Sequence, residues 1–187
     1  MSDSNITKKA ISEALKQLCK EKPFDKISVA DLTAACGLNR QTFYYHFQDK
    51  YELLSWVYYN ENFSKITEDI GFDNWDKKIL QMLKIMKKDK GFYSNTLREQ
   101  EHTFESYLFE MAKALFVEAI DQMDELKTLT ETEKEFDAEF YAYGISGLII
   151  SWAQNGMKIP PETVAARLKC LARAREQVVL TPADTES

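Results

Sequence analysis

The sequence predicts an all-α protein of about nine helices, and three observations carry this prediction. Six glycines and four prolines among 187 residues leave little material for tight turns. Apolar residues recur at helical spacing along most of the chain. No segment shows the alternation between turn residues that is typical of β-strands. With 44% hydrophobic and 29% charged residues, the composition is that of a folded globular protein.

The N-terminal quarter predicts three short helices. The first carries an apolar stripe over residues 6–19 and must end before Pro23. The second begins after Ser28, which can form a capping box with Asp31, and ends at Gly37, the residue that best tolerates a left-handed helix stop.

The third helix takes Asn39 as its cap and presents Phe43 and Phe47 on one face, which we expect to be inward. Asp49 can cap a fourth helix that continues toward Ile66 and joins the two parts of the molecule rigidly.

Five further helical segments follow. Thr130 and Glu133 form a capping box in front of the fourth of them, and Pro160-Pro161 restarts the chain before the last. The five segments span about 75–88, 91–100, 103–125, 133–155 and 161–178.

The sequence therefore predicts two domains, a head of residues 1–48 and a body of residues 49–187. Residues 1–50 hold eight basic and six acidic side chains, which gives a net charge of +2. The remaining residues have a net charge of −8, so the whole chain carries −6. This asymmetry fits an anion-binding head on an acidic body.

Residues 28–47 indicate a function, because two capped helices joined by a glycine turn form a helix-turn-helix. In that motif the second helix lies in the major groove of DNA. Arginine can bond guanine and glutamine adenine, while hydroxyls and lysine suit phosphates. The candidate DNA-binding residues are Ser28, Arg40, Gln41, Thr42, Tyr44, Tyr45, His46 and Lys50. Tyr44 and Tyr45 as core aromatics, and His46 as a capping residue, stay open as alternatives.

The run Thr42–Phe47, followed by Asp49-Lys50 and Leu53-Leu54, resembles the DNA-binding head of the TetR family of bacterial transcription regulators. The resemblance covers about residues 5–54. It implies backbone contacts for Tyr44, His46 and Lys50, and groove-facing positions for Gln41 and Thr42. Ala30 departs from the basic or polar groove contact of many relatives, so base reading should depend more on the third helix.

The body resembles a subgroup related to activators of the dihydroxyacetone kinase operon. The residues that carry this resemblance are Arg40–Tyr44, Leu53–Trp56, Tyr143–Trp152 and Asn155–Met157. In that subgroup the regulator can respond to a kinase-like partner protein rather than to a free small molecule.

Two effector sites are therefore open for the body. In one, an apolar cavity among Tyr93, Phe104, Tyr107 and Tyr141 admits a small molecule. In the other, these rings fill the cavity and an outer face binds a partner protein. The sequence favours the second version slightly, because bulky rings crowd the cavity and no buried charge is evident to orient a polar ligand.

Residues 140–157 contain no charged side chain. This length is at the lower limit of a membrane span, but the polar and glycine residues within it favour a helix that is buried all round inside a protein. One chain has too few helices to surround it, so we expect a homodimer built from the last two helices. The candidate interface residues are Gly147, Leu148, Ile149, Ser151, Trp152 and Leu168.

The sequence favours neither an enzyme nor a cofactor or metal protein. It has no glycine-rich phosphate loop and none of the common hydrolase or zinc-protease motifs, and its two histidines are far apart. Three cysteines without a CxxC pair, and an N-terminus without signal-peptide form, predict a cytoplasmic protein. The remaining alternative is a helical protein-interaction module, a co-regulator that no longer binds DNA.

Overall fold

The computed structural model of the chain describes residues 3–71, 73–98, 103–124 and 127–179. Every regular element within these ranges is helical, which confirms the predicted all-α class. Three α-helices form the head, with a 3-10 turn between the first two. They are α1 (Asp3–Glu21), η1 (Phe24–Lys26), α2 (Val29–Cys36) and α3 (Arg40–His46).

The body begins with α4 (Lys50–Tyr58), which continues through a π-helical turn, η2 (Tyr59–Phe63), into α5 (Ser64–Thr67). Five helices complete it: α6 (Trp75–Lys88), α7 (Lys90–Thr96), α8 (Thr103–Met123), α9 (Glu131–Gln154) and α10 (Pro161–Val179). Counted with α4, η2 and α5 as one run, the described residues contain the nine helices that the sequence predicts.

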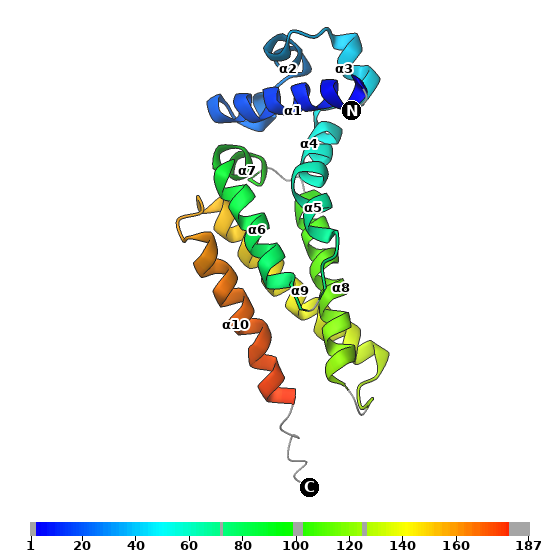
Figure 1. Cartoon of the computed structure of the whole chain (residues 1–187). Coiled ribbons are helices and arrows are strands. Elements are labelled where there is room, and N and C mark those ends of the chain that lie inside the picture. Colours follow the sequence, from blue (N-terminus) through cyan, green and yellow to red (C-terminus); the bar gives the residue numbers. More distant parts are fainter. Residues whose placement is uncertain (1–2, 72, 99–102, 125–126, 180–187) are drawn as a thin grey trace.

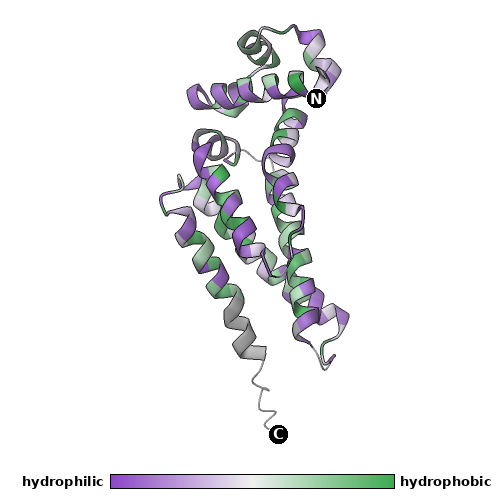
Figure 2. Cartoon of the chain, viewed as in Figure 1, coloured by the Kyte–Doolittle hydropathy of each residue, from purple (hydrophilic) through white to green (hydrophobic). Residues whose placement is uncertain are grey.

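The head lies across one end of an elongated body, and α4 and α5 lead from it along α8 (Figure 1). The helices α8 and α9 pack against each other, and α10 packs along α6. Between them, the short helix α7 contacts both α1 of the head and α9 of the body. Along α6, hydrophobic and hydrophilic segments follow one another within each turn, as expected for an amphipathic helix with one apolar and one polar face (Figure 2).

The predicted helix starts are confirmed by their hydrogen bonds. Ser28 and Thr130 form capping boxes with Asp31 and Glu133. The side chain of Asn39 accepts from the amide of Thr42, at 2.8 Å. At the end of α2, Gly37 has a φ of 68°, the left-handed conformation that a side chain would strain.

One hydrophobic core runs from the head into the body. Phe43 and Phe47 are buried in it, at 0% and 2% exposure, which confirms their predicted inward positions. The core passes along α4 through Leu54 and Val57 to the helices of the body. The division at residues 48 and 49 stays a prediction, because α4 packs on α1 as well as on α8.

One expectation about buried surface is wrong. Ile6, the first residue of the predicted apolar stripe, is 56% exposed, and the buried side of α1 begins at Ile11.

The uncharged stretch of α9 is only partly covered within one chain, since Phe140, Tyr143 and Leu148 lie at the surface. This agrees with the expectation that one chain has too few helices to surround it.

Candidate nucleic-acid interface

The helix-turn-helix is held by its own local hydrogen bonds and by the core beneath it. The amide of Leu38 donates to the carbonyl of Thr33, at 2.9 Å, and this bond turns the chain sharply after α2. The hydroxyl of Thr42 donates to the cap residue Asn39, at 3.0 Å. With Phe43 fully buried, the rotation of α3 about its axis is determined. The remaining residues of α3 therefore occupy defined positions outside or on the flanks.

The structure brings most of the predicted DNA-binding residues together on α3. Arg40 and Gln41 are exposed in its first turn. Tyr44 is 56% and Tyr45 83% exposed, so the alternative that these two rings are core aromatics is wrong. His46 is half-buried, and the ring of Tyr45 meets its imidazole edge to face with centroids 5.0 Å apart. This surface offers a guanidinium, an amide and two phenols on a rigid helix.

Ser28 lies at the start of α2, where its amide and hydroxyl already donate hydrogen bonds within the head. Its amide and its hydroxyl both donate to Asp31, at 2.8 and 2.7 Å. Lys22 pairs with the same carboxylate at 2.8 Å and, with the bonds from Ser28, holds the pKa of Asp31 well below its ordinary value. A phosphate contact by Ser28 would need one of these bonds to open.

Lys50 has a position that the sequence did not predict. Its ammonium donates to the backbone carbonyls of Phe24, Asp25 and Ile27, at 2.9, 2.9 and 3.0 Å. It also lies 4.7 Å from the centre of the Phe24 ring. An ammonium has three protons to donate, so these carbonyls use its full capacity. In this structure Lys50 joins the start of α4 to the turn that precedes α2.

The Lys50→Met variant separates this role from a phosphate contact. We expect the free energy of unfolding to fall by about 2 kcal/mol, because three carbonyls, two of them in partly buried contacts, lose a charged donor. The measurement is urea unfolding, with Lys65→Met as the control, since Lys65 is exposed on α5. Unchanged stability, combined with a salt dependence of DNA binding that is weaker by about one counterion, would assign Lys50 to phosphate instead.

The candidate dimer residues divide into two groups. Gly147, Leu148 and Ser151 are exposed on α9. Ile149, Trp152 and Leu168 are 0%, 7% and 2% exposed and belong to the core of the single chain, so their side chains leave little surface for a second copy and their place in the interface stays a prediction. The indole of Trp152 even donates to the carbonyl of Ile159, at 2.9 Å.

The exposed side of α9 carries three aromatic rings that the sequence reasoning did not select for the interface. Phe136, Phe140 and Tyr143 are 70%, 68% and 67% exposed and follow one another at helical spacing. Farther along the same helix, a Cβ added at Gly144 or Gly147 would meet nothing within 4 Å. The fold of one chain gives no reason for either glycine.

Three of the four candidate effector residues lie together. The centroids of Tyr93 and Phe104 are 5.8 Å apart, and Phe63 stands 4.8 Å from Phe104 and 5.3 Å from Tyr107. Rings at such distances are in contact and fill the space between them. Tyr141 lies elsewhere, stacked on Phe116 at 5.1 Å.

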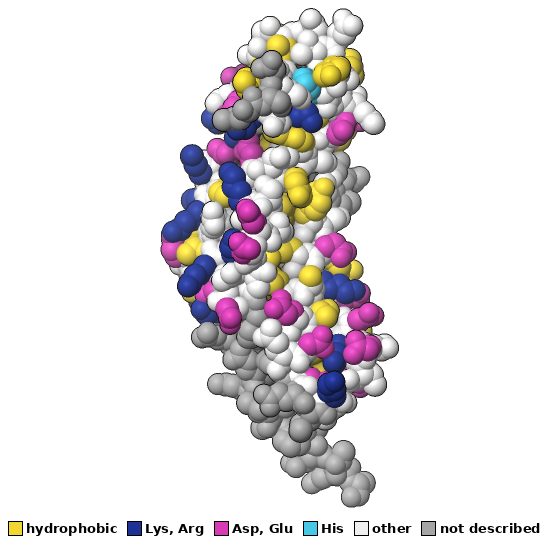
Figure 3. All heavy atoms as spheres, turned by 45° about the vertical axis from the view of Figure 1, so that its right-hand side comes forward, with side chains coloured by type: hydrophobic (Ala, Val, Ile, Leu, Met, Phe, Trp, Pro, Cys, Tyr) yellow, Lys and Arg dark blue, Asp and Glu magenta, His cyan; other side chains and the backbone are white. Residues whose placement is uncertain are grey.

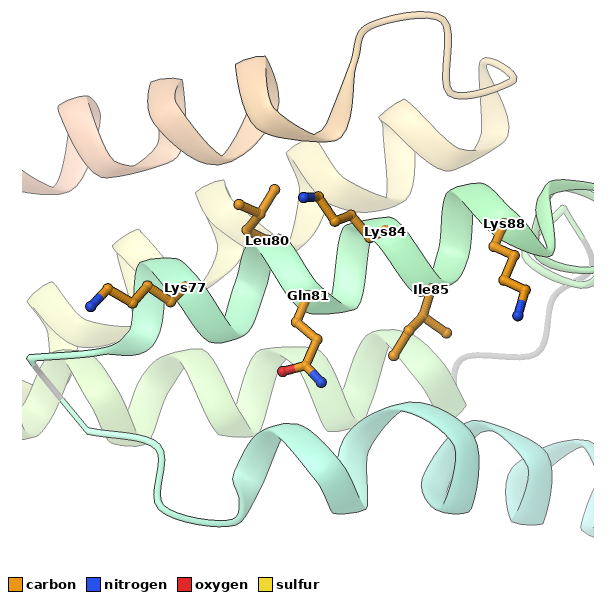
Figure 4. A pocket seen from close by; sticks show the side chains of 6 residues that line it. All are labelled: Lys77, Leu80, Gln81, Lys84, Ile85 and Lys88. Atoms are coloured by element: carbon orange, nitrogen blue, oxygen red, sulfur yellow. The ribbon is translucent and has the colours of Figure 1, made fainter.

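One hollow of the body, of about 350 Å³, follows the outer side of α6, away from these rings. Leu80 and Lys84 extend there toward α10, and Ile85 extends toward the opposite side (Figure 4). Its lining residues are Lys77, Leu80, Gln81, Lys84, Ile85 and Lys88. Basic side chains gather along one edge of the body (Figure 3). None of the four candidate effector residues lines this hollow.

None of the described helices is long and apolar enough to cross a membrane. The apolar stretch of α9 therefore does not reach the requirement for a span.

Comparison with known proteins gives matches over the head and the body. A family model described as "Bacterial regulatory proteins, tetR family" matches residues 11–56, and one described as "Transcriptional regulator C-terminal region" (TetR_C_8) matches residues 73–174. The second match alone covers more than half of the chain.

A curated relative is the HTH-type dhaKLM operon transcriptional activator DhaS of Lactococcus lactis subsp. lactis (strain IL1403). It is 33% identical over 107 residues, which cover 56% of this chain and 57% of the relative. The alignment thus spans little more than half the length of that relative.

Solved structures with the same fold cover nearly the whole chain. One described as dihydroxyacetone kinase operon activator DhaS matches with a TM-score of 0.72 and 25% identity, covering 92% of this chain and 97% of its own. NalD, the secondary repressor of the MexAB-OprM multidrug efflux pump in Pseudomonas aeruginosa, matches with 0.64 and 20%, covering 91% and 97%.

These matches agree with the surface on α3 and with the helix order behind it. They are regulators of transcription rather than enzymes, and none favours the alternative of an interaction module that has lost DNA binding. The chain belongs to the TetR family of bacterial transcription regulators and is a DNA-binding regulator of transcription.

Proposed function

We propose that the protein acts in the cytoplasm as a homodimer that binds a palindromic DNA operator and is controlled through its body by a partner protein. The observation that supports the operator contact is the surface of α3, where Arg40, Gln41 and Tyr44 stand exposed on a helix fixed by buried Phe43. Such a helix can enter the major groove without rearranging.

In the complex, α3 lies with its N-terminal turn against the bases. Arg40 and Gln41 extend from that turn and read guanine and adenine edges. The phenol of Tyr44 and the flanking groups of Tyr45 and His46 contact phosphates, which orient the head but carry no sequence information. Thr42 is oriented toward Asn39 and contributes through its methyl group or by exchanging that bond.

The dimer is built on the exposed side of α9. Its N-terminal half carries Phe136, Phe140 and Tyr143, and its C-terminal half carries the open positions Gly144 and Gly147. When two copies of α9 cross antiparallel around a two-fold axis, the rings of one copy lie over the small residues of the other. Leu148, and Leu171 of α10 at 57% exposure, extend this surface.

The two-fold dimer determines the form of the operator. Two copies of α3 reach successive major grooves, so the half-sites should mirror each other about 34–36 Å apart or at a multiple of that distance. Selection from a library of random duplexes tests this directly. We expect a palindromic consensus, whereas a single unrepeated motif would contradict the dimeric arrangement.

A partner protein is favoured as the effector because the aromatic rings fill the region in which a ligand would be bound. Phe104 and Tyr93 are both fully buried. The relative DhaS is described as an activator of the dhaKLM operon, which agrees with a kinase-like partner of the kind that the subgroup resemblance implies. Such a partner acts because it binds the dimer more tightly in a conformation with one spacing of the two heads than in a conformation with another spacing.

Two probes distinguish the possible effectors in calorimetric titrations of the dimer. One is a purified dihydroxyacetone-kinase-like subunit from the same genome, and the other is dihydroxyacetone alone. We expect heat of binding with the kinase-like protein and none with the small molecule. Direct saturable binding of dihydroxyacetone would contradict control by a partner protein.

A further inference from the structure

The head and the body meet at a side chain that caps α1 from outside the head. Asn95 of α7 donates from Nδ2 to the carbonyls of Cys19 and Lys22, at 2.8 and 2.9 Å. Its Oδ1 accepts from the amide of Phe24, at 2.9 Å. The last carbonyls of a helix have no partner within it. One amide from the body thus supplies what the end of α1 and the start of η1 lack.

The segment that Asn95 holds is also the one held by Lys50. Asn95 binds it from α7, and Lys50 binds the carbonyls of Phe24, Asp25 and Ile27 from α4. The segment of residues 19–27 leads directly into the helix-turn-helix at Ser28. A displacement of α7 relative to α4 is therefore transmitted to the residues that orient α2 and α3.

The other side of α7 is attached to the end of α9. The hydroxyl of Ser94 donates to the carbonyl of Ala153, at 3.0 Å, and the amide of Gln154 donates to the carbonyl of Leu97, at 2.7 Å. Ser94 and Asn95 are adjacent, so consecutive residues bind the proposed dimerisation helix and the head. The helix α7 is a bridge of seven residues between the two.

A second polar link holds the middle of α1. Lys16 donates to Glu61 of η2 at 2.9 Å and pairs with Asp89, just before α7, at 3.5 Å. Ser12, one turn earlier, donates to the same Glu61 at 3.1 Å. Burial opposes the charge on Lys16, but the hydrogen bonds that its ammonium donates to Glu13 and Glu61 outweigh this effect and raise the pKa of Lys16 above the ordinary value. This link attaches α1 to the body at Glu61 and Asp89.

The capped junction is bordered by open space. A hollow of about 460 Å³ lies beside it, lined by residues 19–23 at and after the end of α1, by Gly91, Ser94 and Asn95 of α7, and by Arg98 just after α7. A Cβ added at Gly91 would lie 3.4 Å from Cγ of Lys20, so the two helices approach closely there. Because solvent lies beside the cap, water can bind these backbone groups once Asn95 releases them, so the angle between head and body can change when the three bonds open.

We propose that Asn95 is the positioning residue that sets the angle of the head on the body and thereby the half-site spacing that the dimer accepts. Its three bonds fix the end of α1 relative to α7, and α7 fixes it relative to α9. Without these bonds each head turns more freely on the body, and the affinities for operators of different spacing become more similar. This inference rests on the proposed dimer through α9.

The test uses a set of palindromic duplexes with the selected half-sites and spacers changed by one or two base pairs. Affinities are measured for the full-length unmodified protein, for Asn95→Ala and for Asn95→Asp. The aspartate has the size of asparagine and can still accept from Phe24, but it cannot donate to the two carbonyls. Asn60→Ala is the matched control, because the Asn60 amide donates only within its own helical run, to the carbonyl of Trp56, at 2.9 Å.

For the unmodified protein and for Asn60→Ala we expect the best spacing to be preferred by about tenfold, within the range usual for coupled sites. For both Asn95 variants we expect this preference to fall to about threefold or less, because the coupling between the head angle and the spacing is weakened. A role in folding alone would lower the affinity for all duplexes and leave the preference in place.

Thermal unfolding of each variant accompanies these titrations. Asn95 variants that keep the full spacing preference would overturn the assignment and leave the dimer intact. An unmodified protein with no spacing preference would overturn both the assignment and the dimer. If Asn95→Ala does not fold, Asn95→Asp decides between these outcomes.

Discussion

Replacement of Leu148 by glutamate is expected to dissociate the dimer and abolish operator binding. Leu148 is 50% exposed in the single chain and lies on the side of α9 with Gly144 and Gly147. A carboxylate there would lie against the apolar rings of the other copy, in a surface that would be desolvated. Linking two binding modules raises affinity by about 10²- to 10⁴-fold, so a monomer should lose about as much.

Sedimentation velocity and operator titration measure the two effects. Ala114→Glu on α8 is the control, because it adds the same charge at an exposed position outside the proposed interface. We expect this control to remain dimeric and to bind DNA as the unmodified protein does. Phe140→Glu should behave like Leu148→Glu. A Leu148→Glu variant that sediments as a dimer would show that the interface lies elsewhere.

Removal of the two side chains in the first turn of α3 should abolish base reading without abolishing DNA binding. Each bidentate contact to a base contributes about 1–3 kcal/mol of discrimination, so Arg40→Ala combined with Gln41→Ala should lower operator affinity by about 30-fold or more. Affinity for unrelated duplexes should change little from the loss of Gln41 and somewhat more from the loss of the positive charge of Arg40.

Repeated selection from random duplexes measures this change as a flatter consensus. Gln48→Ala serves as the control, because Gln48 is exposed just after α3 and outside its first turn. Tyr44→Phe should instead weaken binding to all sequences alike, since it removes only a hydroxyl placed for phosphate. An unaltered consensus after the double replacement would contradict the assignment of base contacts to Arg40 and Gln41.

The helices of this protein could be predicted because their signals are local. Ser28 with Asp31 and Thr130 with Glu133 lie within one turn of each other, so the sequence shows both partners of each capping box at once. The orientation of α3 followed from Phe43 and Phe47, whose spacing of one turn defines a single buried side.

The exposed side of α9 could not be predicted because nearly every position of its C-terminal half is apolar or small. Helical periodicity identifies a buried side only when the other side is polar. Ile149 and Trp152 were therefore indistinguishable from Leu148 in the sequence, although the structure buries the first two and exposes the third. Glycines at 144 and 147 were the available signal, because a helix interior disfavours glycine unless another backbone approaches.

The roles of Lys50 and Asn95 depend on contacts between distant parts of the chain. Lys50 binds carbonyls 23–26 residues earlier, and Asn95 binds backbone groups 71–76 residues earlier. A side chain that bonds to backbone leaves no pattern in the sequence, because every residue supplies the same carbonyl and amide. The sequence therefore indicates only a phosphate contact for Lys50, through its resemblance to a phosphate-contacting position, and gives no signal at Asn95.

Sequence-specific binding of duplex DNA by the head is tested most directly by one affinity ratio. The measurement compares the palindromic consensus duplex with a scrambled duplex of the same length and composition, at physiological salt. We predict that the consensus is bound at least about 1,000-fold more tightly, the lower limit usual for specific regulators. Equal affinity for the two duplexes, at a concentration where the protein is dimeric and folded, would contradict the account.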